Sequence, residues 1–271
     1  MAVIDLNADL GETVDGVPTA DDEAMFAVIS SASVACGGHA GDAASMAAAV
    51  TRASRFGVAV GAHPSYPDPA NFGRLPVAMD SAELAASVAG QLEALRLAGA
   101  DLRYVKPHGA LYHAVTHDPA QADAVARAVA GISSGIGRPL PILGLGGEIA
   151  RAAASAGLPF VREAFLDRGY RPDGGLVPRS EPGALLDDPD LVAARAVRLA
   201  LDGEVEAVDG SVIRALLTAP PRAAGAWSGA SGRVDPAASL CLHGDSPAAV
   251  AMARAVRAAL DGAGVEVRAP W

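Results

Sequence analysis

The chain has 271 residues, a formal net charge of −10 and 4 % aromatic residues. This length allows one large α/β domain or two small ones. The acidic balance argues against a nucleic-acid backbone or an anionic membrane surface as a partner. No apolar run reaches the roughly 18 residues that a membrane-spanning helix needs, and the N-terminus lacks the pattern of a signal peptide. We therefore expect a cytoplasmic protein with no nucleic-acid or membrane partner.

The chain opens with a segment, Val3–Asp9, whose side chains alternate in character with the period of a β-strand. Such alternation gives one apolar face and one polar face. Two carboxylates lie on the polar face, which is therefore either a solvated surface or the wall of a site. The polar residues are Asp5, Asn7 and Asp9, and the apolar residues are Ile4, Leu6, Ala8 and Leu10.

Six more short β-like segments follow, and each comes before a helical pattern. One helix start has the pattern of a capping box, and three others place a cap residue directly before a proline. The predicted strands are Ser33–Gly37, Val58–Ala62, Leu102–Lys106, Leu140–Leu143, Phe160–Phe165 and Ser239–Leu242. The predicted cap residues are Asp80 (with Glu83), Asp118, Asp188 and Ser246.

The repeated β-then-α order predicts one parallel β/α architecture, and a closed barrel fits this order better than an open sheet. No linker-like change of composition interrupts the chain before residue 200. We therefore predict a single domain over residues 1–271. The segment Arg214–Ala238 is rich in Pro, Gly, Ser and Ala, and we expect a loop insertion there, either a working lid or a functionally silent loop.

In a parallel barrel the outer face of each strand lies under helices and must be apolar. This places Asp5, Asn7 and Asp9 on the inner side, where carboxylates are costly unless they are hydrogen-bonded, paired or metal-bound. Catalytic groups of such barrels lie at the C-terminal ends of the strands. The first strand therefore predicts a site, and the alternative is a half-exposed edge strand with a wet face.

The other strand ends favour the site. Four of the six histidines and the only lysine lie there, although each histidine alone could be a structural one and the single lysine could be chance. His113 and His117 lie beyond a strand end and are expected at the surface or in packing. The polar residues at the strand ends are His39, His63, Lys106, His108, Glu163, Asp167, Arg168 and His243.

This set of side chains restricts the chemistry. Carboxylates and imidazoles in one pocket supply general acids and bases near neutral pH, and Lys106 would hold a substrate carboxylate or a developing oxyanion. The sequence lacks both the Gly-x-Ser-x-Gly motif of serine hydrolases and the Gly-x-x-x-x-Gly-Lys-[Ser/Thr] phosphate loop. A divalent metal is an open alternative, with Asp9, His39, His63 and His108 as ligands.

Seven segments at these positions resemble the LamB/YcsF family, in family order along nearly the whole chain. The segments are Asp5–Glu12 (DLNADLGE), Ala35–Asp42 (ACGGHAGD), Gly61–Asp68 (GAHPSYPD), Val105–Tyr112 (VKPHGALY), Glu163–Tyr170 (EAFLDRGY), Leu176–Arg179 (LVPR) and Leu242–Asp245 (LHGD).

The resemblance implies an irregular seven-stranded TIM-like β/α barrel of the glycoside hydrolase/deacetylase type, akin to metal-dependent polysaccharide deacetylases. It implies cleavage of 5-oxo-L-proline to L-glutamate, with ATP as co-substrate and together with 5-oxoprolinase subunits B and C. Mg²⁺ would accompany ATP through those partner subunits. Gly38 stands where the family has an aromatic residue, which is expected to widen the pocket near His39, and Arg214–Ala238 stands where the family has a short connection.

Asp9, nearest the C-terminal end of its strand, is the preferred general base or metal ligand. We expect Asp9→Asn to abolish most activity and to leave thermal stability unchanged or raised, because an inward carboxylate carries a desolvation cost. Asp5, deeper in, would orient its neighbours. The catalytic candidates are Asp5, Asp9, Lys106, His108 and Glu163, and the substrate-binding candidates are Asn7, His39, His63, Asp167, Arg168 and His243.

Two other functions remain open at this point. The chain could be a free-standing metal-dependent amide hydrolase or deacetylase, which the Asp and His set favours. It could also be a non-catalytic subunit that binds the small-molecule substrate for its partners.

Overall fold

The computed structural model describes residues 2–214 and 238–271. Most of the segment expected to be a loop insertion, Arg214–Ala238, lies outside the described residues. The strands are β1 (Ala2–Leu10), β2 (Thr13–Val14), β3 (Val17–Pro18), β4 (Ser31–Ala35), β5 (Ala59–His63), β6 (Leu102–Val105), β7 (Ile142–Gly144), β8 (Phe160–Phe165), β9 (Val205–Glu206), β10 (Val212–Ile213), β11 (Ala238–Cys241) and β12 (Val265–Val267). The helices are α1 (Asp22–Phe26), α2 (Ala43–Phe56), α3 (Ser81–Leu97), α4 (Gly109–His117), α5 (Pro119–Ile136), α6 (Glu148–Ser155), α7 (Pro189–Asp202) and α8 (Ala249–Gly262).

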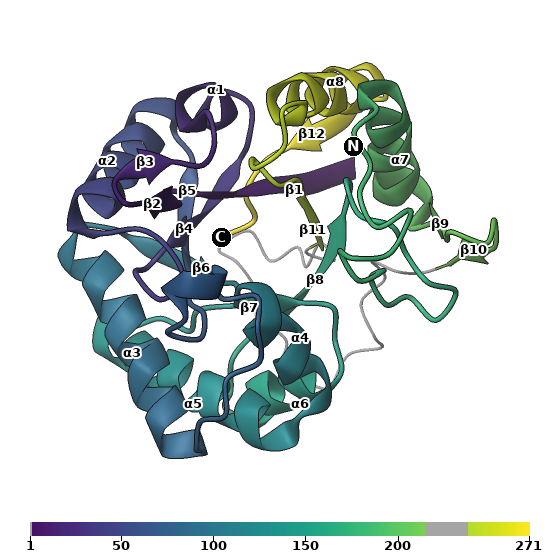
Figure 1. Cartoon of the computed structure of the whole chain (residues 1–271). Coiled ribbons are helices and arrows are strands. Elements are labelled where there is room, and N and C mark those ends of the chain that lie inside the picture. Colours follow the sequence, from purple (N-terminus) through teal and green to yellow (C-terminus); the bar gives the residue numbers. More distant parts are fainter. Residues whose placement is uncertain (1, 215–237) are drawn as a thin grey trace. The chain divides into compact units, whose positions relative to one another are not determined.

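Strands and helices alternate along the chain as the sequence predicted (Figure 1). The main sheet has the order β11-β8-β7-β6-β5-β4-β1-β12, and β11 also pairs with β1. The two ends of a run of seven strands are thereby joined, with β12 added to β1. This is the topology of an irregular seven-stranded β/α barrel, so the predicted fold class is confirmed.

Strand β1 pairs in parallel with two strands at different points of its length. Its residues Asp5–Asn7 pair with Ser239–Cys241 of β11, and Ala2–Ile4 pair with Val265–Val267 of β12. All seven predicted strands are present, with ends within two residues of the prediction. Strand β12 was not predicted, because three residues are too short for a periodic pattern and only the pairing with β1 makes them a strand.

Contacts within the chain form two compact units. Residues 9–22, 32–161 and 271 form one unit, in which helices α2 to α6 accompany strands β4 to β7 (Figure 1). Residues 1–8, 23–31 and 162–270 form the other, in which α7 packs against α8. The prediction of a single domain over residues 1–271 stays a prediction.

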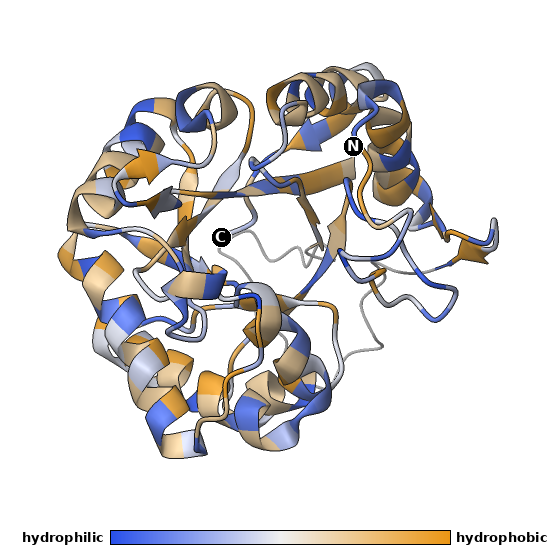
Figure 2. Cartoon of the chain, viewed as in Figure 1, coloured by the Kyte–Doolittle hydropathy of each residue, from blue (hydrophilic) through white to orange (hydrophobic). Residues whose placement is uncertain are grey.

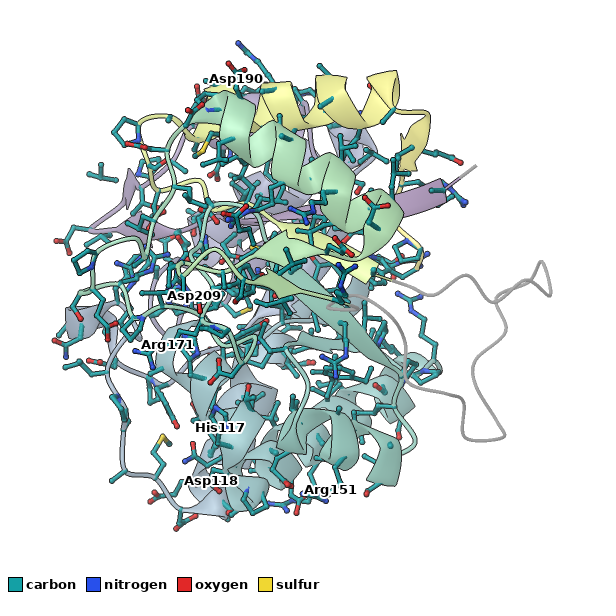
Figure 3. The ribbon with its side chains drawn as sticks, turned by 90° about the vertical axis from the view of Figure 1, so that its right-hand side faces the viewer. His117, Asp118, Arg151, Arg171, Asp190 and Asp209 are labelled. Carbon is teal, nitrogen blue, oxygen red and sulfur yellow. The ribbon has the colours of Figure 1, made fainter. Side chains whose placement is uncertain are left out.

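The helices show mixed colours by hydropathy, as amphipathic helices do, whereas the strands are largely apolar (Figure 2). His113 and His117 on α4 are exposed, as expected, and Figure 3 shows His117 beside Asp118, the cap residue of α5. No helix among the described residues is both long and apolar enough to span a membrane.

Both faces of β1 are buried from Ile4 onward. The exposed fraction is at most 4 % for Ile4, Leu6, Ala8 and Leu10, and it is 1 %, 0 % and 6 % for Asp5, Asn7 and Asp9. The alternative of a half-exposed edge strand with a wet face is therefore wrong. Each of these polar side chains must find its partners inside the protein.

Three of the four predicted caps are confirmed. Asp80 accepts hydrogen bonds from the backbone N–H groups of Ala82 and Glu83, and Glu83 completes the capping box. Asp118 and Asp188 cap α5 and α7 in the same way. The fourth prediction is wrong, because Ser246 lies in a turn and α8 begins at Ala249, three residues later.

These caps give a matched pair of variants. Asp80→Ala should lower the free energy of unfolding by about 1 kcal/mol, because two N–H groups at the start of α3 lose their acceptor. Ser246→Ala should leave it unchanged, because the buried Ser246 hydroxyl has no hydrogen-bond partner among the described residues. Urea unfolding followed by circular dichroism measures both. Equal losses in the two variants would contradict the assigned start of α8.

Candidate functional site

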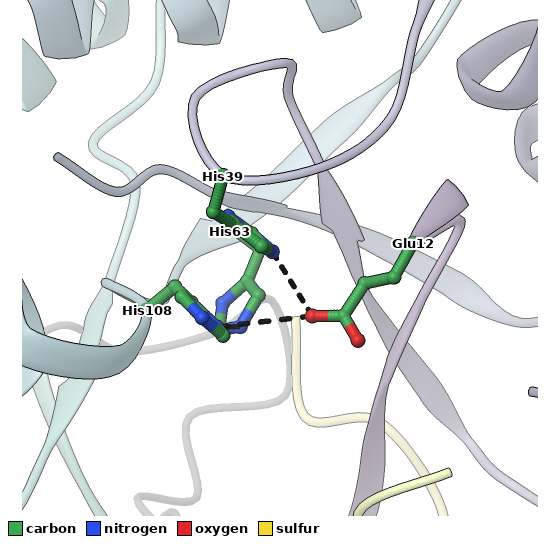
Figure 4. A group of neighbouring side chains, drawn as sticks. All are labelled: Glu12, His39, His63 and His108. Carbon is green, nitrogen blue, oxygen red and sulfur yellow. Dashed lines mark hydrogen bonds and ion pairs between the residues drawn. The ribbon is translucent and has the colours of Figure 1, made fainter. Parts of the chain in front are cut away.

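Three histidines and one glutamate converge at the C-terminal ends of neighbouring strands (Figure 4). Glu12 follows β1, His39 follows β4, His63 is the last residue of β5, and His108 directly precedes α4. Their exposed fractions are 7 %, 1 %, 1 % and 6 % in that order. We call these four residues the histidine cluster. The sequence predicted its histidines, but it did not identify Glu12.

Glu12 is central to the histidine cluster. Its Oε1 atom lies 3.0 Å from Nε2 of His39 and 3.7 Å from Nδ1 of His108, which the dashed lines of Figure 4 mark. His63 Nε2 lies 3.0 Å from the same nitrogen of His108. Glu12 comes two residues after the end of β1, so the rule that polar residues at strand ends form the site would have identified it.

Backbone carbonyl groups fix the protonation of two of the imidazole rings. His63 Nδ1 lies 2.7 Å from the carbonyl oxygen of Lys106, and His108 Nε2 lies 2.9 Å from that of Phe72. Because a carbonyl oxygen only accepts hydrogen bonds, each of these nitrogens carries a proton and donates. In the neutral rings, His63 Nε2 and His108 Nδ1 therefore present lone pairs.

The imidazoles of His39 and His108 are held neutral. Burial, together with the neighbouring histidines, lowers the pKa of both rings well below the ordinary value. The two rings stack in parallel, with their centroids 3.6 Å apart. They therefore serve as hydrogen-bonding groups, bases or ligands at pH 7 rather than as permanent cations.

Lys106 and Asp9 form a buried ion pair beside the histidine cluster. The Nζ atom of Lys106 lies 2.8 Å from Oδ1 of Asp9, and the other oxygen, Oδ2, lies 3.2 Å from Nε2 of His63. Lys106 is 1 % exposed. The structure thus brings together Asp9, His39, His63, Lys106 and His108, all predicted as site residues, and adds Glu12.

Gly38 does not widen the pocket near His39, contrary to the expectation from the missing aromatic side chain. A Cβ atom on Gly38 would lie 2.3 Å from Oε1 of Gln91 and 2.5 Å from the hydroxyl of Ser65. The Gln91 amide fills this space and exchanges two hydrogen bonds with the backbone of Ser65, at 2.9 and 2.8 Å. Gln91 and Ser65 thus lie against Gly38. Ser65 belongs to the segment Gly61–Asp68 that resembles the family, whereas Gln91 belongs to no such segment.

A second buried polar group connects Asp5, Asn7 and Glu163 through Ser239. Asn7 Nδ2 donates to Oε2 of Glu163 at 2.9 Å and to Ser239 Oγ at 2.7 Å. Asp5 accepts from the hydroxyl of Ser239 and, at 2.6 Å, from that of Ser31. Burial outweighs these bonds and raises the pKa of Asp5 to about 6. That Asp5 orients its neighbours for catalysis stays a prediction.

Asp167 and His243 form a pair of their own, with His243 Nδ1 2.9 Å from Oδ2 of Asp167. Burial favours the neutral acid, but the charge of His243 and its hydrogen bonds outweigh burial and lower the pKa of Asp167. The guanidinium of Arg168 donates to the backbone carbonyls of Val177 and Ala184, at 2.7 and 3.1 Å. Arg168 thus holds the loop after β8, and a substrate contact for it stays a prediction.

Comparison with known proteins identifies the family. The model of the LamB/YcsF family matches residues 4–220 and 222–270. The chain belongs to this family. The loop insertion expected at Arg214–Ala238 stays a prediction.

Named relatives and a solved structure match over the same length. The A subunit of a 5-oxoprolinase from Streptomyces griseus is 49 % identical, with 98 % of this chain and 99 % of the relative covered. The corresponding protein from Kocuria rhizophila is 48 % identical, over 99 % of each. The crystal structure of a lactam utilization protein from Thermus thermophilus is 40 % identical, with a TM-score of 0.84 and 98 % and 99 % of the chains covered.

The buried ion pair changes the expected effect of Asp9→Asn on stability. Removing the carboxylate that lies 2.8 Å from a buried ammonium leaves that charge poorly compensated. We now expect Asp9→Asn to lower the free energy of unfolding by about 3 kcal/mol or more, and Lys106→Met to lower it as well. The double variant should lose clearly less than the sum, by at least ~1 kcal/mol, in a urea double-mutant cycle. Additive losses would contradict the ion pair.

The raised pKa of Asp5 predicts a pH dependence of stability. Between pH 3.8 and about 6 the folded protein holds a proton on Asp5 that the unfolded chain has lost, so stability falls as pH rises through this range. Across this range the free energy of unfolding should fall by about 3 kcal/mol. The Asp5→Asn variant should not show this fall, because its side chain does not titrate. Urea unfolding of both proteins from pH 4 to 7 measures the difference between them.

Ser239→Ala provides the control, because its hydroxyl bond lowers the pKa of Asp5. The decline in stability should then extend to higher pH. If the stability difference between wild type and Asp5→Asn were constant across this pH range, Asp5 would not be the group that titrates.

Proposed function

We propose that this chain is the A subunit of an ATP-dependent 5-oxoprolinase, which cleaves 5-oxo-L-proline to L-glutamate together with subunits B and C in the cytoplasm. The names of the relatives support this proposal, since they match along nearly the full length of both chains. The name of the Thermus protein also refers to a lactam. Similarity in fold does not establish a reaction, so the residues of the site must be able to carry out lactam cleavage.

The substrate makes three demands on a site. Its five-membered lactam is a resonance-stabilised amide, so opening it needs a base to activate the attacking water and a cation or donor at the developing oxyanion. The second demand comes from the carboxylate of 5-oxo-L-proline, which needs a positively charged partner. The third is the exclusion of bulk water, because charged groups interact more strongly in a dry site.

The observation that carries the proposal is the buried contact of Lys106, Asp9 and His63. One oxygen of Asp9 is held by the Lys106 ammonium at 2.8 Å, and the other lies 3.2 Å from His63. Asp9 is thus oriented as the candidate base, and His63 lies next to it. The compact ammonium of Lys106 supplies the positive charge for the substrate carboxylate or the oxyanion.

ATP would act by phosphorylating the lactam oxygen, which makes the ring carbon easier to attack. The sequence has a single lysine and lacks the phosphate-loop motif. We therefore assign ATP and its Mg²⁺ to the partner subunits B and C, and ring opening of the activated lactam to this chain.

The proposal predicts that turnover depends on the partners. The chain alone should release negligible L-glutamate from 5-oxo-L-proline and ATP, and adding subunits B and C should restore ATP-dependent release. A coupled glutamate assay measures this. Robust turnover by the isolated chain without ATP would instead identify a free-standing amide hydrolase.

Lys106→Arg tests the site within the reconstituted complex. The planar guanidinium keeps the charge but is larger and binds differently, so kcat/KM should fall at least about tenfold. Because Lys106 is buried, the variant's fold is checked first by circular dichroism. A change in KM with an unaltered kcat would favour a non-catalytic subunit that only binds substrate.

A further inference from the structure

We propose that His63, His108 and Glu12 bind one divalent transition-metal ion of the class that prefers imidazole and carboxylate ligands, such as Zn²⁺ or Co²⁺. Nothing in the similarity to known relatives assigns this site; it follows from the positions of lone pairs in the histidine cluster. It does not depend on the proposed oxoprolinase activity.

The carbonyl oxygen of Lys106 accepts a hydrogen bond from the N–H of His63, and that of Phe72 accepts one from the N–H of His108. The remaining nitrogens, Nε2 of His63 and Nδ1 of His108, both carry lone pairs and lie 3.0 Å apart. Two lone pairs at this distance repel each other unless a cation lies between them. Metal-binding histidines characteristically donate their other N–H to a backbone carbonyl or a carboxylate, as both of these do.

Glu12 supplies the carboxylate ligand. Its Oε1 lies 3.7 Å from Nδ1 of His108, and one ligand atom from each member of the histidine cluster lies within 4.8 Å of every other. Zinc and related ions bind nitrogen and oxygen ligands at about 2.0–2.2 Å, so ligand atoms on one ion are separated by about 3 to 4 Å. Two histidines and one glutamate are a ligand set of catalytic zinc sites.

His39 belongs to the support of this site rather than to its ligands. Its ring is stacked on that of His108, at 5° and 3.6 Å between centroids. Stacked parallel rings cannot both direct an in-plane lone pair at one ion that lies about 2 Å away. Instead, Nε2 of His39 lies 3.0 Å from Oε1 of Glu12 and orients this carboxylate. This assignment replaces Asp9 and His39, in the ligand set expected from the sequence, with Glu12.

The charges around the site are those of the buried carboxylates of Asp9 and Glu12, the ammonium of Lys106 and the guanidinium of Arg74, whose charge acts on His39. Asp9 Oδ2 also lies 3.2 Å from Nε2 of His63, so a second acceptor faces that lone pair. When bound, a divalent ion supplies a Lewis acid. The competing occupant is a proton that makes His63 an imidazolium, and the experiment distinguishes the two.

The full chain is stripped of metal with a chelator and titrated with Zn²⁺ by calorimetry and with Co²⁺ by visible absorption. We expect one ion per chain, a dissociation constant of about 1 μM or lower, and Co²⁺ d–d bands with nitrogen and oxygen ligation. Bound zinc should raise the melting temperature. Absence of stoichiometric binding up to about 100-fold this concentration would overturn the proposal, and an imidazolium signal of His63 in ¹⁵N NMR would then identify the proton as occupant.

Variants locate the site. His63→Gln, His108→Gln and Glu12→Gln should each weaken binding at least about 100-fold, whereas His39→Gln should keep the stoichiometry and weaken binding about tenfold, as expected for a residue that orients a ligand. His117→Gln, at an exposed histidine, is the matched control and should bind like wild type. Circular dichroism shows whether each variant folds, and Glu12→Gln keeps the shape of the side chain if the histidine variants fail. Wild-type affinity in folded Glu12→Gln would overturn the proposed ligand set.

Discussion

Two backbone carbonyl groups, those of Lys106 and Phe72, determine what the histidine cluster can do. Each accepts a hydrogen bond from the N–H of one ring nitrogen, so the opposite nitrogens of His63 and His108 turn lone pairs toward each other. A side-chain partner could move or lose its proton, but a carbonyl oxygen cannot donate. The backbone at Lys106, directly after β6, therefore sets the tautomer of His63, and the backbone at Phe72 sets that of His108. Which ring nitrogens of the cluster can bind a cation follows from these two contacts.

Lys106 links the two parts of this arrangement. Its carbonyl fixes His63, and its ammonium holds Asp9, which in turn approaches His63 from the other side. One residue thus places both a base and the imidazole next to it. The contact of the ammonium with Asp9 gives a physical reason for a lysine in a chain that otherwise uses arginine for its positive charge, because a compact ammonium fits a buried position beside a single carboxylate oxygen.

The network of Asp5, Asn7, Glu163 and Ser239 has a different character. Its members are satisfied by one another and by serine hydroxyls, and the pKa of Asp5 is raised to about 6 because burial outweighs those bonds. Such a closed network costs stability when it is charged and specifies strand pairing when it is complete. Asp5 and Ser239 are also register partners in the pairing of β1 with β11. The hydrogen bond between their side chains therefore lies on the strand pair that closes the run of seven strands.

The sequence by itself determined the seven strands, three of four helix caps and the residues that gather at the strand ends, because these depend on local periodicity and on the rule that parallel strands end at the same edge. It also identified the family, through long motifs at those ends. It failed where partners far apart in the chain decide: β12 is a strand through its pairing with β1, Gly38 is closely packed against Gln91 and Ser65, and Asp9 is held by Lys106. Glu12, and the tautomers of His63 and His108, were likewise decided by tertiary structure, since a ring nitrogen's proton depends on which carbonyl lies beside it.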